Sequence, residues 1–205
     1  MNVLSLFSGT QSWTKFYSKE DKIYNIDIEY LYSNTLCRNI LYWDYKTEIT
    51  DKIDIIYASP PCNLYFTILK NLNGNTKYTE QEKQLSIQLV DKTIEIIEYF
   101  RPKFFVIENP VGKMKQHYPK ILDKAFIRLD YCMYGKKYKK PTNIWTNLSF
   151  TPKTCSHGRN HIEQFKDLPL GFVNDEQYRA MIPEELSLEI YNSIKKEMEM
   201  VICEK

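Results

Sequence analysis

The sequence predicts an α/β fold with a doubly wound, mostly parallel sheet and a small appendage. Short apolar runs alternate with stretches of helical periodicity, which is the pattern of strands joined by right-handed helical crossovers. Several of these runs end in a polar functional group, as expected at the carboxyl edge of such a sheet. The chain has 205 residues, of which 43% are apolar, so it can form one domain with a full core.

The apolar runs give the expected strands. Two of them, residues 53–58 and 104–107, read as strands buried on both faces, and the two after residue 126 are weaker. The expected strands are residues 3–7, 24–28, 53–58, 104–107, 127–133 and 143–146.

Helical signals fill the gaps between these strands. Thr79 and Glu82 form a capping box before a long amphipathic stretch that Arg101-Pro102 ends. Pro183 opens a final amphipathic helix with apolar residues at helical spacing. Shorter helices are expected at residues 10–17 and 118–125, and the polar residues 63–78 read as a mobile loop.

Charge and cysteine content narrow the function classes. The net charge of +2 provides no global attraction for nucleic acid, so such a role depends on local clusters such as Lys136 to Lys140, which also reads as a solvated loop. Five scattered cysteines without a leader segment predict a reducing, cytoplasmic setting. No apolar stretch is long enough to cross a bilayer, so we expect a soluble protein without membrane contact.

The strand ends hold the candidate chemistry. Pro60 and Pro61 stop a buried strand and hold Cys62 in a stiff turn, which suits a nucleophile better than the alternative of a small buried hydrophobe. Glu108 follows four apolar residues, where a carboxylate is costly unless it is functional or serves as a cap or ion-pair partner.

A glycine turn after the first strand suggests a cofactor site. Ser8-Gly9 leads toward a helix, and Asp27 ends the next strand, an arrangement that holds nucleoside cofactors through backbone amides and ribose hydroxyls. The segment is not a G-x-G-x-x-G motif, so a plain turn is the alternative reading.

Taken in order, these motifs resemble the cytosine-5 DNA methyltransferase family, in a small, phage- or virus-like form. The specific part is Pro60-Pro61-Cys62 followed about 45 residues later by Glu108-Asn109-Pro110. Phe7-Ser8-Gly9 is similar to the family's first motif, residues 134–142 to its arginine motif, and residues 180–186 to its last motif. The resemblance implies a Rossmann-like class I methyltransferase fold.

The resemblance also implies the chemistry. Cys62 would add to C6 of a flipped-out cytosine in DNA, Glu108 would hold the N3 and N4 edge, and Lys140 would replace an arginine near the base. The cofactor would be S-adenosyl-L-methionine, with a set of expected cofactor-binding residues formed by Phe7, Ser8, Gly9, Asp27, Ile28, Asn39, Ile40 and Pro61.

The chain departs from the family pattern at several positions. Gln11-Ser12 stands where a glycine pair is usual, Asn39 stands where an acid is expected, and Ala180 replaces the asparagine of the last motif. Tyr138 and Thr142 flank Lys140 where further polar and arginine donors are usual.

The resemblance divides the chain into two parts. Residues 1–146 and 180–205 would form the cofactor-binding catalytic domain, and residues 147–179 a small recognition-like insertion, with a partner subunit as a second source of sequence recognition. Cys155, His157 and His161 are spaced like zinc ligands, with Cys132 as a fourth, but this short string lacks a confirmed partner. We predict no metal, with these histidines facing DNA phosphates.

Three other functions stay open. Amino-methyltransferases carry Pro-Pro before an aromatic residue at the same strand end, which Ser59-Pro60-Pro61 matches and Cys62 does not. RNA is a second possible substrate, because nothing in the sequence reads the 2′-hydroxyl. A catalytically impaired relative that binds nucleic acid or a partner is the third. If the protein is viral, the expected location is the interior of the host cell.

Overall fold

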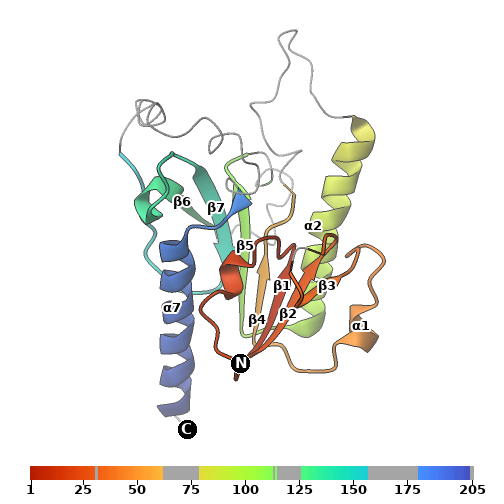
Figure 1. Ribbon diagram of the computed structural model, residues 1–205. Helices are drawn as coiled ribbons and strands as arrows, with labels where there is room; N and C mark the ends of the chain where they lie inside the picture. Colours follow the sequence, from red (N-terminus) through yellow and green to blue (C-terminus); the bar gives the residue numbers. More distant parts are fainter. Residues whose placement is uncertain (31, 62–78, 113, 115–125, 157–179, 204–205) are drawn as a thin grey trace.

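A computed structural model gives the structure of the chain and describes residues 1–30, 32–61, 79–112, 114, 126–156 and 180–203. Within these residues, seven strands form one sheet in the order β3-β2-β1-β4-β5-β7-β6 (Figure 1). The strands are β1 (Asn2–Leu6), β2 (Lys22–Asp27), β3 (Thr35–Cys37), β4 (Ile55–Ala58), β5 (Phe104–Pro110), β6 (Phe126–Asp130) and β7 (Pro141–Thr146). The predicted Rossmann-like, mostly parallel sheet is confirmed.

The register places the functional edge. The first five strands are parallel, with Leu6 beside both Ile26 and Ala58, and Ala58 beside Ile107. β7 runs antiparallel to β5 and β6, so its first residues lie at the carboxyl edge of the parallel strands. That edge therefore gathers the ends of β1, β2, β4, β5 and β6 with the start of β7.

Three expectations for the strands are corrected. Glu108 does not follow β5 but lies within it, because antiparallel pairing with β7 extends the strand through Pro110. The predicted strand at 127–133 ends at Asp130, and a 3-10 helix, η3 (Tyr131–Tyr134), follows and closes at Gly135 with φ +85°. β3 was not predicted, because three residues carry too short a pattern.

Two long helices cover opposite faces of the sheet (Figure 1). Residues of α2 (Glu80–Phe100) pack in the cluster that contains Leu4 and Ile56, whereas residues of α7 (Glu184–Cys203) pack with Val3 and Ile55. Because successive strand residues point to opposite faces, these two clusters lie on either side of the sheet. Both helices were predicted.

The predicted capping box is also confirmed. Glu82 N–H donates to the Thr79 hydroxyl, and Thr79 N–H donates to the Glu82 carboxylate at 2.7 Å. The expected helix at 10–17 is reduced to one 3-10 turn, η1 (Ser12–Thr14), after Gln11 in the left-handed region at φ +56°. A short α1 (Tyr45–Glu48) was not predicted, and the expectations for 63–78 and 118–125 lie outside the described residues.

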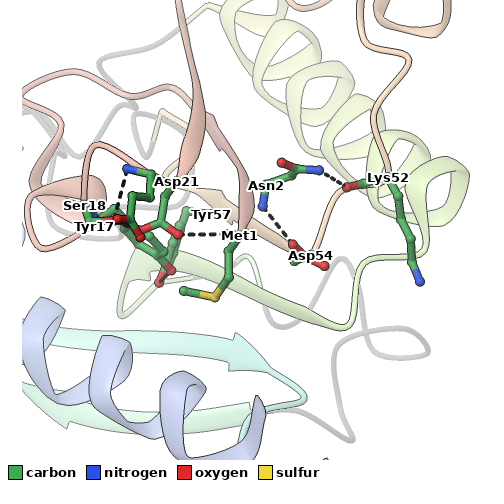
Figure 2. Close-up of polar contacts among 9 residues, drawn as sticks. Met1, Asn2, Tyr17, Ser18, Asp21, Lys52, Asp54 and Tyr57 are labelled. Atoms are coloured by element: carbon green, nitrogen blue, oxygen red, sulfur yellow. Dashed lines mark hydrogen bonds and ion pairs between the residues drawn. The ribbon is translucent and has the colours of Figure 1, made fainter. Parts of the chain in front are cut away.

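Side chains also tie the opposite, amino edge of the sheet. The Asp54 carboxylate accepts from Asn2 N–H at 2.8 Å, and the Asn2 side-chain amide donates to the Lys52 carbonyl (Figure 2). On the α7 face of the sheet, the hydroxyls of Tyr17 and Tyr57 lie 2.9 Å apart. Among the described helices, none is long and apolar enough to cross a membrane.

Candidate active site

The glycine turn after β1 is bonded directly to the acid that ends β2. Gly9 N–H donates to Asp27 Oδ2 at 2.8 Å, and Glu29 N–H donates to Asp27 Oδ1 at 3.0 Å. Phe7, Gly9 and Gln11 all have positive φ, at +55°, +44° and +56°, so the turn coils tightly away from the strand. The structure thus brings together Phe7, Ser8, Gly9 and Asp27 of the predicted cofactor set.

The remaining predicted cofactor residues fall into two groups. Ile28 follows Asp27 and is 65% exposed, and Pro61 is exposed beyond β4, so both side chains are accessible at this edge. Asn39 uses its side-chain oxygen locally, accepting from Leu41 N–H at 3.1 Å. Ile40 is 5% exposed and packs in the core cluster of the α2 side.

A groove of about 920 Å³ opens beside the glycine turn. The turn contributes Thr10 and Gln11, and the residues that lead into α7 contribute Met181 and Ile182. Lys136 also lines it, where burial, and secondarily the nearby charge of Lys140, lowers the pKa of its ammonium to about 8. The last-motif segment therefore lies close to the first motif, although about 170 residues separate them in the sequence.

The turn after β4 is fastened from two sides. The side-chain amide of Asn109 donates to the Pro60 carbonyl at 2.9 Å, and Trp13 Nε1–H donates to the Ser59 hydroxyl at 3.1 Å. Asn109 is fully buried, so this bond is shielded from water. Cys62, the predicted nucleophile, lies outside the described residues, but the carbonyl of Pro60, two positions before it, is held next to β5.

Glu108 is the central carboxylate of the site. It is 4% exposed and sits in β5, opposite Ile144 of β7. The Tyr131 hydroxyl donates to Glu108 Oε1 at 2.8 Å, and Lys140 Nζ lies 3.8 Å from the same oxygen. The structure thus brings the predicted residues Glu108 and Lys140 together.

Tyr131 is a site residue that the sequence reasoning missed. Burial, followed by the charge of Glu108 and their hydrogen bond, raises the pKa of Tyr131 well above its usual value, so the phenol stays protonated. Lys140 Nζ also lies 4.6 Å from the centre of the Tyr131 ring, as in a cation–π contact. The available signal was weak: Tyr131 lies within the predicted strand at residues 127–133 and precedes the basic motif.

The structure describes two of the four residues of the zinc hypothesis, Cys132 and Cys155. Burial raises the pKa of the Cys132 thiol to about 11, with a smaller contribution from its hydrogen bond to the Cys155 thiol, so these two residues lie together. His157 and His161 lie outside the described residues. Across the parts of the chain that the structure describes, no cluster of three or more metal-ligating side chains occurs.

The edge therefore combines two kinds of chemistry. A tight glycine turn with an acid can hold a nucleoside-containing ligand. A buried carboxyl group with one oxygen held by a phenol and an ammonium can donate or accept a proton through its other oxygen. The bond from Asn109 holds the Pro60 carbonyl next to β5, the strand that contains Glu108.

Comparison with known proteins agrees with this arrangement. The model of the family "C-5 cytosine-specific DNA methylase" matches residues 1–142. A Frog virus 3 (isolate Goorha) protein named probable DNA (cytosine-5)-methyltransferase is 34% identical over 166 residues, which cover 76% of this chain and 75% of that protein.

Solved structures show more distant similarity. A prophage-encoded E. coli protein described as a DNA modification methyltransferase is 17% identical with a TM-score of 0.48, covering 75% of this chain and 51% of that one. The Dnmt2 methyltransferase of S. pombe is 15% identical with a TM-score of 0.47, covering 85% and 58%. The chain thus spans about half the length of these solved structures. On the family match and the viral relative, the chain belongs to the C-5 cytosine-specific DNA methylase family.

Proposed function

We propose that the protein transfers a methyl group from S-adenosyl-L-methionine to C5 of cytosine in DNA through a covalent adduct with Cys62. The observation that carries this proposal is the bond from Asn109 to the Pro60 carbonyl. It fastens the turn that leads into Cys62 to the strand that contains Glu108. A Cys62 thiol beside the Glu108 carboxyl group at this edge would match the chemistry of the family.

The proposed reaction begins with addition of the Cys62 thiolate to C6 of the cytosine ring. The sulfur–C6 bond forms, the electrons of the C5–C6 double bond shift toward C4, and N3 takes a proton from Glu108. C5 would then be an enamine carbon that attacks the methyl group, whose bond to the sulfonium sulfur breaks and leaves a neutral thioether. Loss of the C5 proton to a base, departure of the Cys62 thiolate from C6 and return of the N3 proton to Glu108 would restore the aromatic ring. C6 is inaccessible in a duplex, so the target cytosine flips out of the stack.

The residues around the glycine turn fit a sulfonium nucleoside cofactor. The Ser8 hydroxyl is buried without a hydrogen-bond partner among the described residues, and the groove beside the turn provides room. Asp27 would accept from ribose hydroxyls, and exposed Ile28 would cover the adenine. Phe7, Gly9, Asn39, Ile40 and Pro61 complete the proposed set. S-adenosyl-L-methionine supplies the methyl group.

The proposed division of labour follows the sequence. Residues 1–146 and 180–205 form the catalytic domain, and residues 147–179 contact DNA, with or without a partner subunit. Lys140 Nζ lies 3.8 Å from Glu108 Oε1, which would place it near the bound base. Its positive charge would stabilise the negative charge that builds up in the ring during thiol addition, and would attract the phosphate beside the base. The proposed location is the cytoplasm, or the interior of the host cell for a viral protein.

A trapping experiment tests this function. The protein is incubated with S-adenosyl-L-methionine and DNA that contains 5-fluorocytosine, and the products are run on a denaturing gel. Fluorine takes the place of the C5 proton and cannot be removed by a base, so the Cys62 sulfur cannot leave and the adduct accumulates. We expect a covalent protein–DNA species that Cys62→Ser abolishes.

Other products would identify the alternatives. Methylation of the exocyclic amine without any adduct supports an amino-methyltransferase. A trapped adduct with 5-fluorocytosine in RNA, and none with DNA, assigns the substrate to RNA. Nucleic-acid binding without adduct or methyl transfer supports an impaired relative.

A further inference from the structure

We propose that Tyr131 is a positioning residue that decides which oxygen of Glu108 carries the catalytic proton. This inference rests on the proposed function, because it assigns a task to Glu108 in thiol addition. The family motifs identified in the sequence do not include Tyr131 in this role.

The geometry makes the two carboxyl oxygens unequal. Oε1 accepts the Tyr131 O–H at 2.8 Å and lies 3.8 Å from the Lys140 ammonium, which carries hydrogens and no acceptor. A proton on Oε1 would face both donors. The neutral carboxyl group therefore carries its proton on Oε2, and Oε1 remains an acceptor.

This asymmetry matches the edge of cytosine. N3 is an acceptor and needs a proton as the thiolate adds, whereas the N4 amino group is a donor. A carboxyl group with its proton on Oε2 donates to N3 while Oε1 accepts from N4, in addition to the Tyr131 hydroxyl. An oxygen with two lone pairs can accept both bonds. The opposite placement would set two donors against each other.

Tyr131 also acts after the proton has moved. When the sulfur–C6 bond forms, the proton on Oε2 passes to N3, and Glu108 becomes a carboxylate. The Tyr131 O–H and the Lys140 ammonium then stabilise the new charge on Oε1, because hydrogen bonds to charged groups are stronger than neutral ones. The phenol is fully buried, so this donor is already oriented before the base arrives.

The substitution Tyr131→Phe removes the hydroxyl and keeps the ring. We expect the single-turnover rate of adduct formation on 5-fluorocytosine DNA to fall by about 10-fold to 100-fold, in line with loss of a hydrogen bond to a charged group. The dissociation constants for S-adenosyl-L-methionine and DNA should change less than about threefold. Tyr45→Phe is the matched control, because Tyr45 is also buried and donates to a carboxylate, Glu95, at 2.6 Å on the α2 side.

A second base analogue separates proton placement from a structural defect. A 5-azacytosine ring is more electrophilic at C6 and needs less proton assistance, so Tyr131→Phe should slow its adduct formation clearly less than that of 5-fluorocytosine. Equal slowing on both bases, or an unchanged rate on 5-fluorocytosine, overturns the inference. Failure of the unsubstituted protein to form any adduct would instead refute the proposed function.

Discussion

The side-chain amide of Asn109 lies 2.9 Å from the carbonyl oxygen of Pro60, and this bond joins the end of β5 to the turn after β4. Pro60 and Pro61 provide no backbone N–H, so the turn cannot fasten itself to a neighbouring strand through its own donors. The donor comes instead from the residue after Glu108. One buried amide thereby sets the spacing between the carboxyl group and the segment that carries the proposed nucleophile.

Asn109→Ala should uncouple this turn from β5. The Pro60 carbonyl would lose its donor, and we expect a loss of about 1–3 kcal/mol in unfolding free energy together with a fall in adduct formation of roughly 10-fold or more. Asn143→Ala is a matched control, because Asn143 is a buried amide directly opposite Asn109 in the β5–β7 register. Urea unfolding and 5-fluorocytosine trapping measure the two effects. Equal trapping by both variants would contradict the coupling.

Asp27→Asn should weaken cofactor binding through two effects. It removes the charge proposed to face the ribose, and it presents an amide in place of the oxygen that accepts from Gly9 N–H. Isothermal titration with S-adenosyl-L-methionine should show an affinity loss of about 10-fold or more, equivalent to at least ~1.4 kcal/mol. Asp54→Asn also removes a carboxylate that accepts a backbone N–H, but at the amino edge, so it should leave the affinity unchanged (Figure 2).

Lys136 should make stability depend on alkaline pH. Its pKa is lowered from 10.5 to about 8 in the fold, first by burial and second by the charge of Lys140. Between pH 8 and 10.5 the unfolded chain binds more protons at Lys136 than the folded chain does. The penalty for burying the ammonium is therefore relieved as the pH rises, and the unfolding free energy increases. Lys136→Met should remove that rise, which we expect to be roughly 1 kcal/mol after discounting for partial solvent exposure.

Urea titrations at pH 7.5 and pH 10 check this expectation through the difference between the two proteins. The difference cancels the titration of tyrosines that both share. A difference that stays constant, or one that changes in the opposite direction, would show that the Lys136 ammonium is not disfavoured in the fold.

Thr79→Ala should weaken the start of α2. The substitution removes the hydroxyl that accepts from Glu82 N–H, and loss of such a cap costs about 1 kcal/mol of unfolding free energy. Thr79→Ser keeps the oxygen and should retain most of the stability. Thermal unfolding of the three proteins gives the comparison, and equal melting temperatures for Ala and Ser would argue against the cap.

The sequence by itself determined the elements whose signals are local. Apolar runs predicted six of the strands, the Thr79 and Glu82 pair predicted the start of α2, and helical spacing predicted α7. The order of Pro-Pro-Cys and Glu-Asn-Pro predicted the family, because each motif is a short contiguous string that can be recognised without knowing which residues meet in the fold. The pairing of Asp27 with the glycine turn also followed from adjacent parallel strands.

Only the tertiary structure decided how the site is assembled across the sheet. β7 reverses direction, which extends β5 through Glu108 and brings Lys140 to the same edge. The bonds from Tyr131 to Glu108 and from Asn109 to Pro60 join residues that are 23 and 49 positions apart. Such contacts depend on strand order and register, and these are set by packing of the whole core, which no local pattern encodes.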